Sequence, residues 1–253
     1  MQIYRCQLTL LEATFFSSRE VSNTYYTEPC IGNIALAYAL HLCQSPYFND
    51  GAIHYKTHLS QLNEQGIYVT PATIDAPQFT LSQFNAQPDA YWYAMANNTI
   101  VTRPDETWTE KRGAAWYVIK GRGDRGKKVG LENRPQHGRI RALSIGNEAL
   151  FFILSRQPLA IPNYIRLGKF MSKARIKVTK HKANVIEKEA ITIQSLLNPA
   201  DLSPQTALTV FDLIAIPPTP LIRNARLSGE FYQLPNKQFL PVGMRFGVEN
   251  LPD

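Results

Sequence analysis

The chain opens with Gln2-Ile3-Tyr4-Arg5-Cys6-Gln7-Leu8-Thr9-Leu10-Leu11, a stretch in which apolar and polar side chains alternate. One face of an extended chain would carry Tyr4, Cys6, Leu8 and Leu10, and the other face Arg5, Gln7 and Thr9. This period of two predicts a half-buried first strand.

A helix is expected after this strand. Thr27-Glu28-Pro29 supplies a capping residue and a first-turn proline, so we predict that the helix begins there and that Ser45-Pro46 ends it. Its apolar side chains occupy nearly every face: Ile31, Ile34, Ala35, Tyr38 and Leu42 form one stripe, and Leu36 and Leu40 lie on other faces. Such a helix is either deeply buried or covered by a partner.

The later elements are predicted to be mostly strands. Residues 47–110 are polar, aromatic and rich in proline, which favours an irregular elaboration. Short β-rich runs bounded by turn residues follow at 115–120, 139–143, 149–155, 174–178 and 210–216, and residues 240–246 suggest a late edge strand or cap. A strand, a helix and several further strands predict a single α+β domain over residues 1–253, with a ferredoxin-like sheet and helices on one face.

Composition excludes several classes of protein. With 253 residues, 44% hydrophobic, the chain can bury a full core. Three cysteines without a C-x-x-C pair or a histidine cluster make structural zinc and a disulfide framework poor explanations. We find no signal peptide and no apolar run long enough to span a bilayer, so we expect a cytoplasmic protein with no membrane role. We expect no cofactor.

Positive charge is concentrated in the middle of the chain. Residues 111–182 hold 18 Lys+Arg and three acidic residues, a local net charge of +15, so the remaining residues carry −8 of the total of +7. Because backbone phosphates respond to local positive potential, this segment is the candidate nucleic-acid surface. The prediction requires these cations to fold onto one RNA-facing surface.

The basic segment has two halves. In residues 111–141, glycines alternate with cations around an aromatic run, which suits a basic hairpin thumb or arm; a solvated loop is the alternative. In residues 164–177, cations are spaced along a turn and a strand beside Tyr164 and Phe170, as expected for single-stranded RNA, unless the rings are simply core.

Catalysis is not expected. No nucleophile-elbow, P-loop or zinc-protease motif is present, and His54 and His58 have no carboxylate in a suitable position for a metal. The alternative that stays open is a metal-independent endoribonuclease that uses His137 with Tyr117 and Lys120.

Several long segments, in order, resemble one family. They are Leu8–Glu12, Phe15–Glu20, Tyr25–Pro29, Ile165–Ala174, Leu197–Leu202, Pro218–Ile222 and Leu240–Arg245. Together they resemble the Csc-one family, the Cas-five-type subunits of the type I-D CRISPR Cascade, an antiviral defense ribonucleoprotein.

The resemblance implies a modified ferredoxin-like, RRM-type core with a projecting basic β-hairpin thumb. It implies a non-catalytic subunit that holds the 5′ handle of the guide (CRISPR) RNA, beside a Cas-seven-type backbone subunit and a Cas-ten-type large subunit. The alternative function is a metal-independent endoribonuclease that processes precursor CRISPR RNA, as subunits of this type do in some other subtypes. It implies, less directly, a place near the PAM of target double-stranded DNA, while guide pairing reads the target sequence.

The candidate RNA-binding residues combine this resemblance with the charge pattern. They are Ser17, Ser18, Arg19, Lys111, Arg112, Lys120, Arg122, Arg125, Lys127, Lys128, Arg134, His137, Arg139, Arg141, Arg166, Lys169, Phe170, Lys173 and Arg175. No catalytic and no metal-binding residue is predicted.

Overall fold

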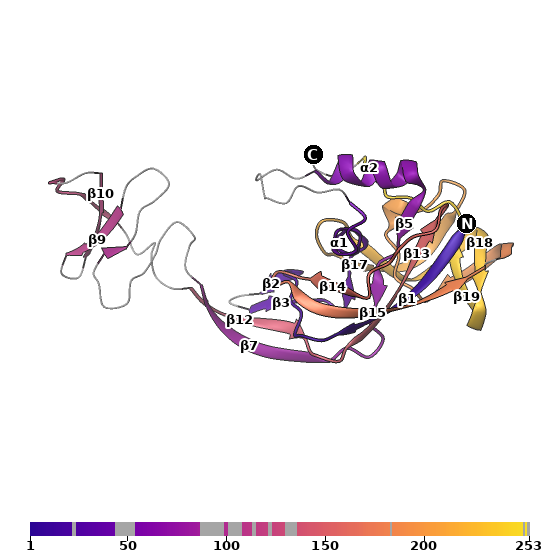
Figure 1. Ribbon diagram of the computed structural model, residues 1–253, viewed down its shortest axis with the longest axis horizontal. Coiled ribbons are helices and arrows are strands. Elements are labelled where there is room, and N and C mark those ends of the chain that lie inside the picture. The colour runs from indigo at the N-terminus through magenta and orange to yellow at the C-terminus, as the bar shows by residue number, and fades with distance from the viewer. Residues whose placement is uncertain are drawn as a thin grey trace. The chain divides into compact units, whose positions relative to one another are not determined.

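The structure is a computed structural model that describes residues 1–21, 24–43, 54–86, 99–100, 108–112, 115–120, 123–129, 136–182, 184–249 and 251. Its elements are shown in Figure 1. The helices are α1 (Asn33–Ala39) and α2 (Tyr55–Gln65), with 3-10 turns at Pro199–Asp201 and Pro235–Lys237. The strands are β1 (Gln2–Leu10), β2 (Arg19–Val21), β3 (Thr24–Tyr26), β4 (Cys30–Ile31), β5 (Ile67–Val69), β6 (Ala72–Thr73), β7 (Phe79–Ala86), β8 (Thr99–Ile100), β9 (Trp108–Arg112), β10 (Ala115–Ile119), β11 (Lys127–Val129), β12 (Gln136–Leu143), β13 (Glu148–Ser155), β14 (Tyr164–Leu167), β15 (Ser172–His181), β16 (Asn184–Ile193), β17 (Ala207–Ile214), β18 (Leu221–Leu234) and β19 (Gln238–Pro241).

The chain divides by its contacts into two compact units. Unit 1 comprises residues 1–21, 25–81 and 141–253, and unit 2 comprises residues 22–24 and 82–140. The chain leaves unit 1 within β7 and returns to it within β12. The prediction of one domain with a basic arm at 111–141 stays a prediction.

Unit 1 is built around a central antiparallel sheet. Its strand order is β14-β15-β1-β13-β6-β4, and β5 also pairs with β13. In β1 the side chains of Cys6, Leu8 and Leu10 are fully buried, whereas Arg5 and the polar residues between them are only half-buried. The predicted first strand and its alternation are therefore confirmed, and β1 lies between β15 and β13 in the middle of the sheet.

Two helices cover the inner face of this sheet. Ile34 and Leu36 of α1 and Leu59 and Leu62 of α2 are buried in the same core as the inner side chains of β1. The predicted helix is thus present and deeply buried, but its predicted start at residues 27–29 was wrong. Residues Cys30–Ile31 instead form β4, which pairs with β6, so the helix begins only at Asn33.

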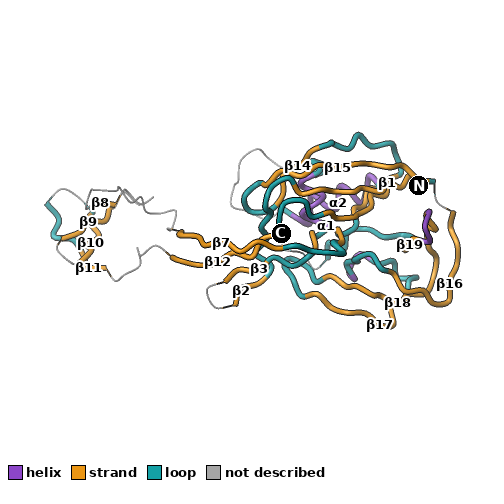
Figure 2. The backbone as a smooth tube through the Cα atoms, turned by 90° about the horizontal axis from the view of Figure 1, so that it is seen from below, coloured by secondary structure: helices purple, strands orange, loops and turns teal. Residues whose placement is uncertain are grey.

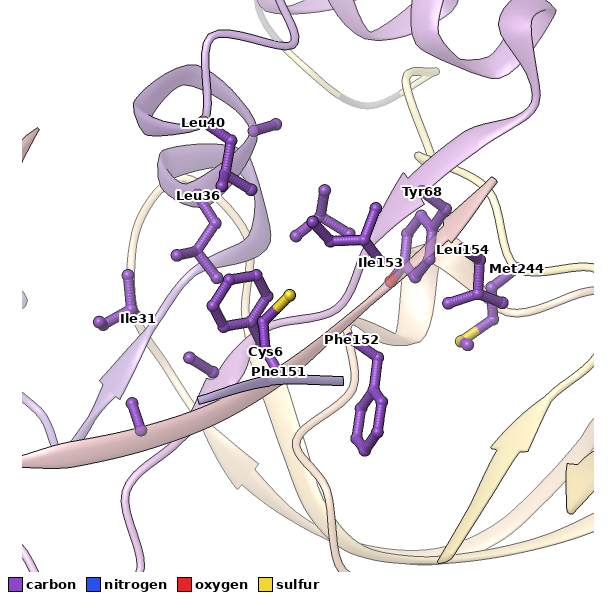
Figure 3. Close-up of a cluster of buried hydrophobic side chains, with 14 of the residues drawn as sticks. Cys6, Ile31, Leu36, Leu40, Tyr68, Phe151, Phe152, Ile153, Leu154 and Met244 are labelled. Carbon is purple, nitrogen blue, oxygen red and sulfur yellow. The ribbon is translucent and has the colours of Figure 1, made fainter. Parts of the chain in front are cut away.

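A second sheet covers part of the outer face. Its order is β16-β18-β17, with β19 also paired to β18, and it forms a separate layer in Figure 2. Figure 3 shows why both layers are needed: Phe151 and Phe152 are neighbours on β13, and their rings point to opposite sides of the strand. Both rings are fully buried, so β13 is apolar on both faces. The other end of the outer face, on β1 and β15, is polar.

A buried carboxylate joins three parts of unit 1. Asp201, 1% exposed, accepts hydrogen bonds from Asn33 Nδ2 at 2.6 Å, Tyr68 Oη at 2.8 Å and the Gly247 amide nitrogen at 2.8 Å. Burial outweighs these bonds and raises the pKa of Asp201 to about 6. This buried carboxylate could not be predicted from local sequence, because its three hydrogen-bond partners are more than 40 residues away along the chain.

The remaining sequence predictions have mixed outcomes. The strands expected at 115–120, 139–143, 149–155, 174–178 and 210–216 appear as β10, β12, β13, β15 and β17. Within 47–110, however, the described residues include α2 and five strands, which differs from an irregular elaboration. The described residues are mostly β with two α-helices, so the α+β class fits only loosely. No helix among them is long and apolar enough to cross a membrane.

Candidate nucleic-acid interface

The outer face of the central sheet carries a row of cations at its β14–β15 edge. In β15, buried Ser172, Ala174 and Ile176 alternate with exposed Lys173, Arg175 and Lys177. Anchoring of one face in the core forces the other face into solvent, and the three cations recur roughly every 6.6 Å along the strand. The sequence singled out Lys173 and Arg175 and placed the cations through Lys177 along a turn and a strand.

Neighbouring strands extend this polar face. Tyr164 of β14 pairs with Arg175, and Arg166 pairs with Lys173. On the other side of β15, Thr9 and Gln7 of β1 pair with Arg175 and Lys177 respectively. Cross-strand partners point to the same side of a sheet, so the cations lie between an exposed tyrosine ring and a strip of hydrogen-bonding side chains.

This face is hollowed beside the cations. A depression of about 750 Å³ is lined by Gln7, Thr9, Glu148, Asn163, Tyr164, Arg175, Ile176, Lys177 and Val178. Among the described residues, no carboxylate forms an ion pair with Arg175 or Lys177. Their charge is therefore available to an anion in the hollow. Gln7, Thr9 and Glu148 were missed as site residues, although the alternation of β1 already placed the first two on this face.

The turn between β14 and β15 is fixed against the loop that follows β1. Gly168 has φ +70°, and a Cβ there would lie 2.5 Å from the carbonyl oxygen of Phe15, so the close approach requires glycine. The Lys169 amide donates to the same oxygen at 2.9 Å. The Phe170 ring stacks on the buried Phe15 ring, with centroids 5.5 Å apart, yet it is 62% exposed. One ring face thus remains a candidate for base stacking.

Glu12 organises two of the predicted cations. Its carboxylate accepts a hydrogen bond from the Lys173 amide at 2.7 Å and lies 3.9 Å from the Arg166 guanidinium. Arg166 also donates to the Met171 carbonyl at 3.0 Å, and the Lys173 ammonium lies 4.7 Å from the centroid of the Tyr164 ring. These contacts orient the two cations while both side chains stay exposed.

The predicted serines and arginine after β1 are engaged within the chain. The Ser18 hydroxyl accepts a hydrogen bond from the Glu28 amide at 3.1 Å, and Arg19 forms an ion pair with Glu28 at 2.8 Å. Ser17 is half-buried beside them. Their predicted role in RNA binding stays a prediction.

Arg141 is packed rather than exposed. Its guanidinium carbon lies 4.1 Å from the centroid of the Phe79 ring and 4.8 Å from that of Tyr26, and one terminal nitrogen donates to the Thr27 carbonyl at 3.3 Å. Its Nε is buried without a hydrogen-bond partner among the described residues. This arginine is held as part of the local packing, and its contact with RNA stays a prediction.

Unit 2 holds a second group of the predicted cations. Its sheet has the order β11-β10-β9-β8. Asp124 accepts the amides of Lys120 and Gly126, each at 3.0 Å, and these bonds lower the pKa of its carboxyl. They fix the turn between β10 and β11, where Lys120, Arg125 and Lys127 are exposed. The Arg112 guanidinium is held by the Arg125 carbonyl at 2.9 Å and by Glu110 at 3.3 Å.

The other predicted residues are only partly covered by the structure. Arg139 is exposed on β12. Arg122 and Arg134, together with the side chains of Lys111, Lys128 and His137, lie outside the described residues. The proposed acid–base use of His137 therefore has no geometry to test it. The structure brings Arg166, Lys173 and Arg175 together in unit 1 and Arg112 and Arg125 together in unit 2. Arg19 and Arg141 lie around the Tyr26 ring instead.

The described part of the chain offers little for metal or nucleophile chemistry. It contains no group of three or more His, Cys, Asp or Glu side chains able to hold a metal ion. Cys6, Cys30 and Cys43 are buried free thiols, and burial raises the pKa of each to about 12, so they are poor nucleophiles. The polar sheet face is therefore the site that these residues support best.

Comparison with known proteins identifies the family. No curated protein matches the chain. A chain in a cryo-EM structure of a type III-B Cmr-beta complex, bound to cognate target RNA and AMPPnP, is similar over 88% of this chain and 86% of its own length, with 13% identity and a TM-score of 0.42, which is too low to assign the fold. The family model of the type I-D CRISPR-associated protein Cas5/Csc1 matches residues 1–249. This match covers nearly the whole sequence, and the chain belongs to the type I-D CRISPR-associated Cas5/Csc1 family.

Proposed function

We propose that this chain is a non-catalytic subunit of a type I-D CRISPR effector complex, and that the outer face of β14, β15 and β1 holds the 5′ handle of the guide RNA. Family membership supports the effector-subunit part of the proposal. The position of the RNA on this face is our inference from its chemistry.

The observation that carries the proposal is the row of exposed cations on β15 beside the hollow lined by Tyr164. Arg175 and Lys177 supply positive charge for phosphates, whereas Tyr164 and Phe170 expose rings on which bases can stack. This combination binds single-stranded RNA with little dependence on sequence, because every base has a stacking face and every nucleotide carries a phosphate.

The partners follow from the same proposal. The subunit would contact a Cas-seven-type backbone subunit and a Cas-ten-type large subunit, with unit 2 as the basic thumb that reaches a neighbour. It would lie at the PAM-proximal end, near target double-stranded DNA. We also propose that the central sheet is a modified ferredoxin-like, RRM-type sheet, since α1, which follows β1 after three short strands, packs on one face while the opposite face stays partly open.

Incubation of the purified chain with labelled repeat RNA in metal-free buffer tests the proposal. We expect salt-dependent binding without cleavage. Each neutralised phosphate contact should change the slope of log K against log[salt] by about 0.7 for a single strand. Lys169→Glu combined with Lys173→Glu should weaken binding and flatten this slope without loss of fold.

Two results would contradict the proposal. Unchanged binding by the double variant would remove the turn and the start of β15 from the site. Discrete cleavage by the wild-type chain, abolished in His137→Ala, would show that the subunit is the alternative endoribonuclease.

A further inference from the structure

A second hollow on the same sheet face differs in charge from the first. It has a volume of about 460 Å³ and is lined by Arg5, Gln7, Thr73, Asp75, Ala76, Gln78, Gly146, Asn147, Glu148, Ala149 and Leu150. Gln7 and Glu148 line both hollows, so the two adjoin at this pair of side chains. The face therefore continues from the cations of β15, across β1, to the start of β13.

Two of the three charged groups that line the second hollow are carboxylates. The carboxylates of Asp75 and Glu148 line it, with the Arg5 guanidinium as its single cation. Gln7 Nε2 donates to Glu148 Oε2 at 3.0 Å, which orients this carboxylate, and the other oxygen of Glu148 has no hydrogen-bond partner in the described part of the chain. Two carboxylates disfavour a phosphate here by like-charge repulsion.

The rim of the second hollow is held in place by Asn147, which is 5% exposed. Its Oδ1 accepts the Gln78 amide at 2.9 Å, and its Nδ2 donates to the carbonyls of Gln78 and Ser144, each at 2.8 Å. These bonds tie the segment before β7 to the turn before β13. Because the Asn147 amide is used internally, Arg5, Asp75 and Glu148 are left as the charged groups that line the hollow.

We propose that the second hollow binds an unpaired nucleobase that carries an exocyclic amino group, such as cytosine or adenine, and that it disfavours uracil. The inference rests on the proposed function, in which the RNA backbone follows the cations of β15 in the adjoining hollow. A carboxylate accepts from the amino group of cytosine, as acidic side chains do in base-edge recognition. Uracil presents carbonyl oxygens on both sides of its single N–H, and these repel the carboxylates.

Binding of two pyrimidine RNAs to the purified chain tests this inference. The probes are fluorescein-labelled oligo(C) and oligo(U) of about eight nucleotides, within the site sizes of single-strand binders. The two bases are similar in size and shape, so their affinity ratio reports mainly the base edge. We expect wild-type protein to favour oligo(C) by about fivefold or more, as one good base-edge contact provides.

Substitutions then assign the preference to the hollow. Glu148→Gln and Asp75→Asn replace a carboxylate oxygen with an amide donor at constant size, and we expect each to reduce the ratio toward one. The matched control is Glu187→Gln, which removes one exposed negative charge on β16 outside both hollows. It should leave the ratio at the wild-type value.

The outcomes separate this inference from the proposed function. If both oligonucleotides bind with a steep salt dependence but with equal affinity, or if Glu148→Gln and Asp75→Asn leave a preference intact, the inference is overturned and the proposed function stands. If neither oligonucleotide binds at low salt, both are overturned.

Discussion

Neutralisation of the two cations that line the basic hollow, in the double variant Arg175→Gln and Lys177→Gln, gives the strongest quantitative prediction. Both side chains are exposed on β15, while their neighbours Ala174 and Ile176 are buried, so the change should leave the strand and its core contacts intact. The charge effect should then be separable from any effect on folding.

The expected magnitude follows from counterion release. If each cation neutralises one phosphate of a single strand, the double variant should reduce the salt slope by about 1.4 in log–log units. At 0.1 M salt, this corresponds to roughly 25-fold weaker binding, about 2 kcal/mol, and the difference should shrink toward zero near 1 M salt.

The assay is a salt titration of handle-RNA binding by fluorescence anisotropy. The matched control is Lys188→Gln with Arg226→Gln, which removes one exposed lysine and one exposed arginine from the second sheet of unit 1. Equal thermal midpoints would show that all three proteins fold alike. Equal salt slopes for the two double variants would contradict the prediction, because net charge rather than the β15 face would then control binding.

Three further predictions test other parts of the structure. Phe170→Ala should weaken RNA binding by about fivefold or more at an unchanged salt slope, because it removes a stacking ring but no charge; unchanged affinity would make the ring purely structural. In urea unfolding, Gly168→Ala should cost about 1–3 kcal/mol more than Gly146→Ala, since both have positive φ but only the first brings a Cβ against the Phe15 carbonyl oxygen; equal losses would contradict the close approach. Burial raises the pKa of Asp201 to about 6. The protonated carboxyl therefore contributes fully to the free energy of unfolding below about pH 4, and this contribution, up to roughly 3 kcal/mol, is lost as the pH rises through about 6. The thermal midpoint of Asp201→Asn relative to wild type should therefore rise between pH 4 and 6, and a difference independent of pH would contradict this.

Local patterns were predictable where one face of a strand is buried. The alternation in β1 and the alternating cations of β15 both follow from a period of two, and both are present in the structure. The Csc-one resemblance, which covered most of the chain in order, agrees with the family match over residues 1–249.

Features that depend on distant pairing were not predictable in the same way. The capping pattern at Thr27-Glu28-Pro29 suggested an early helix, but Cys30 and Ile31 pair with β6 some 40 residues later, and tertiary pairing overrides local propensity. Helix α2 escaped prediction because only Leu59 and Leu62 of its residues are buried, which leaves a weak apolar stripe.

The second hollow also required the fold. Its lining comes from β1, from residues 73–78 and from residues 146–150, which are brought together only by the order β1-β13-β6. In the sequence, Asp75 and Glu148 are isolated acids in unrelated segments. Their joint chemistry follows from the sheet and not from any motif.

The position of RNA on the outer face of β14, β15 and β1 is tested by ultraviolet crosslinking of handle RNA to the chain, followed by mass spectrometry of the crosslinked peptides. We expect crosslinks at Tyr164 or Phe170 and in the adjoining peptides of β15 and β1. Crosslinks confined to the second sheet of unit 1, on β16 to β19, would contradict it.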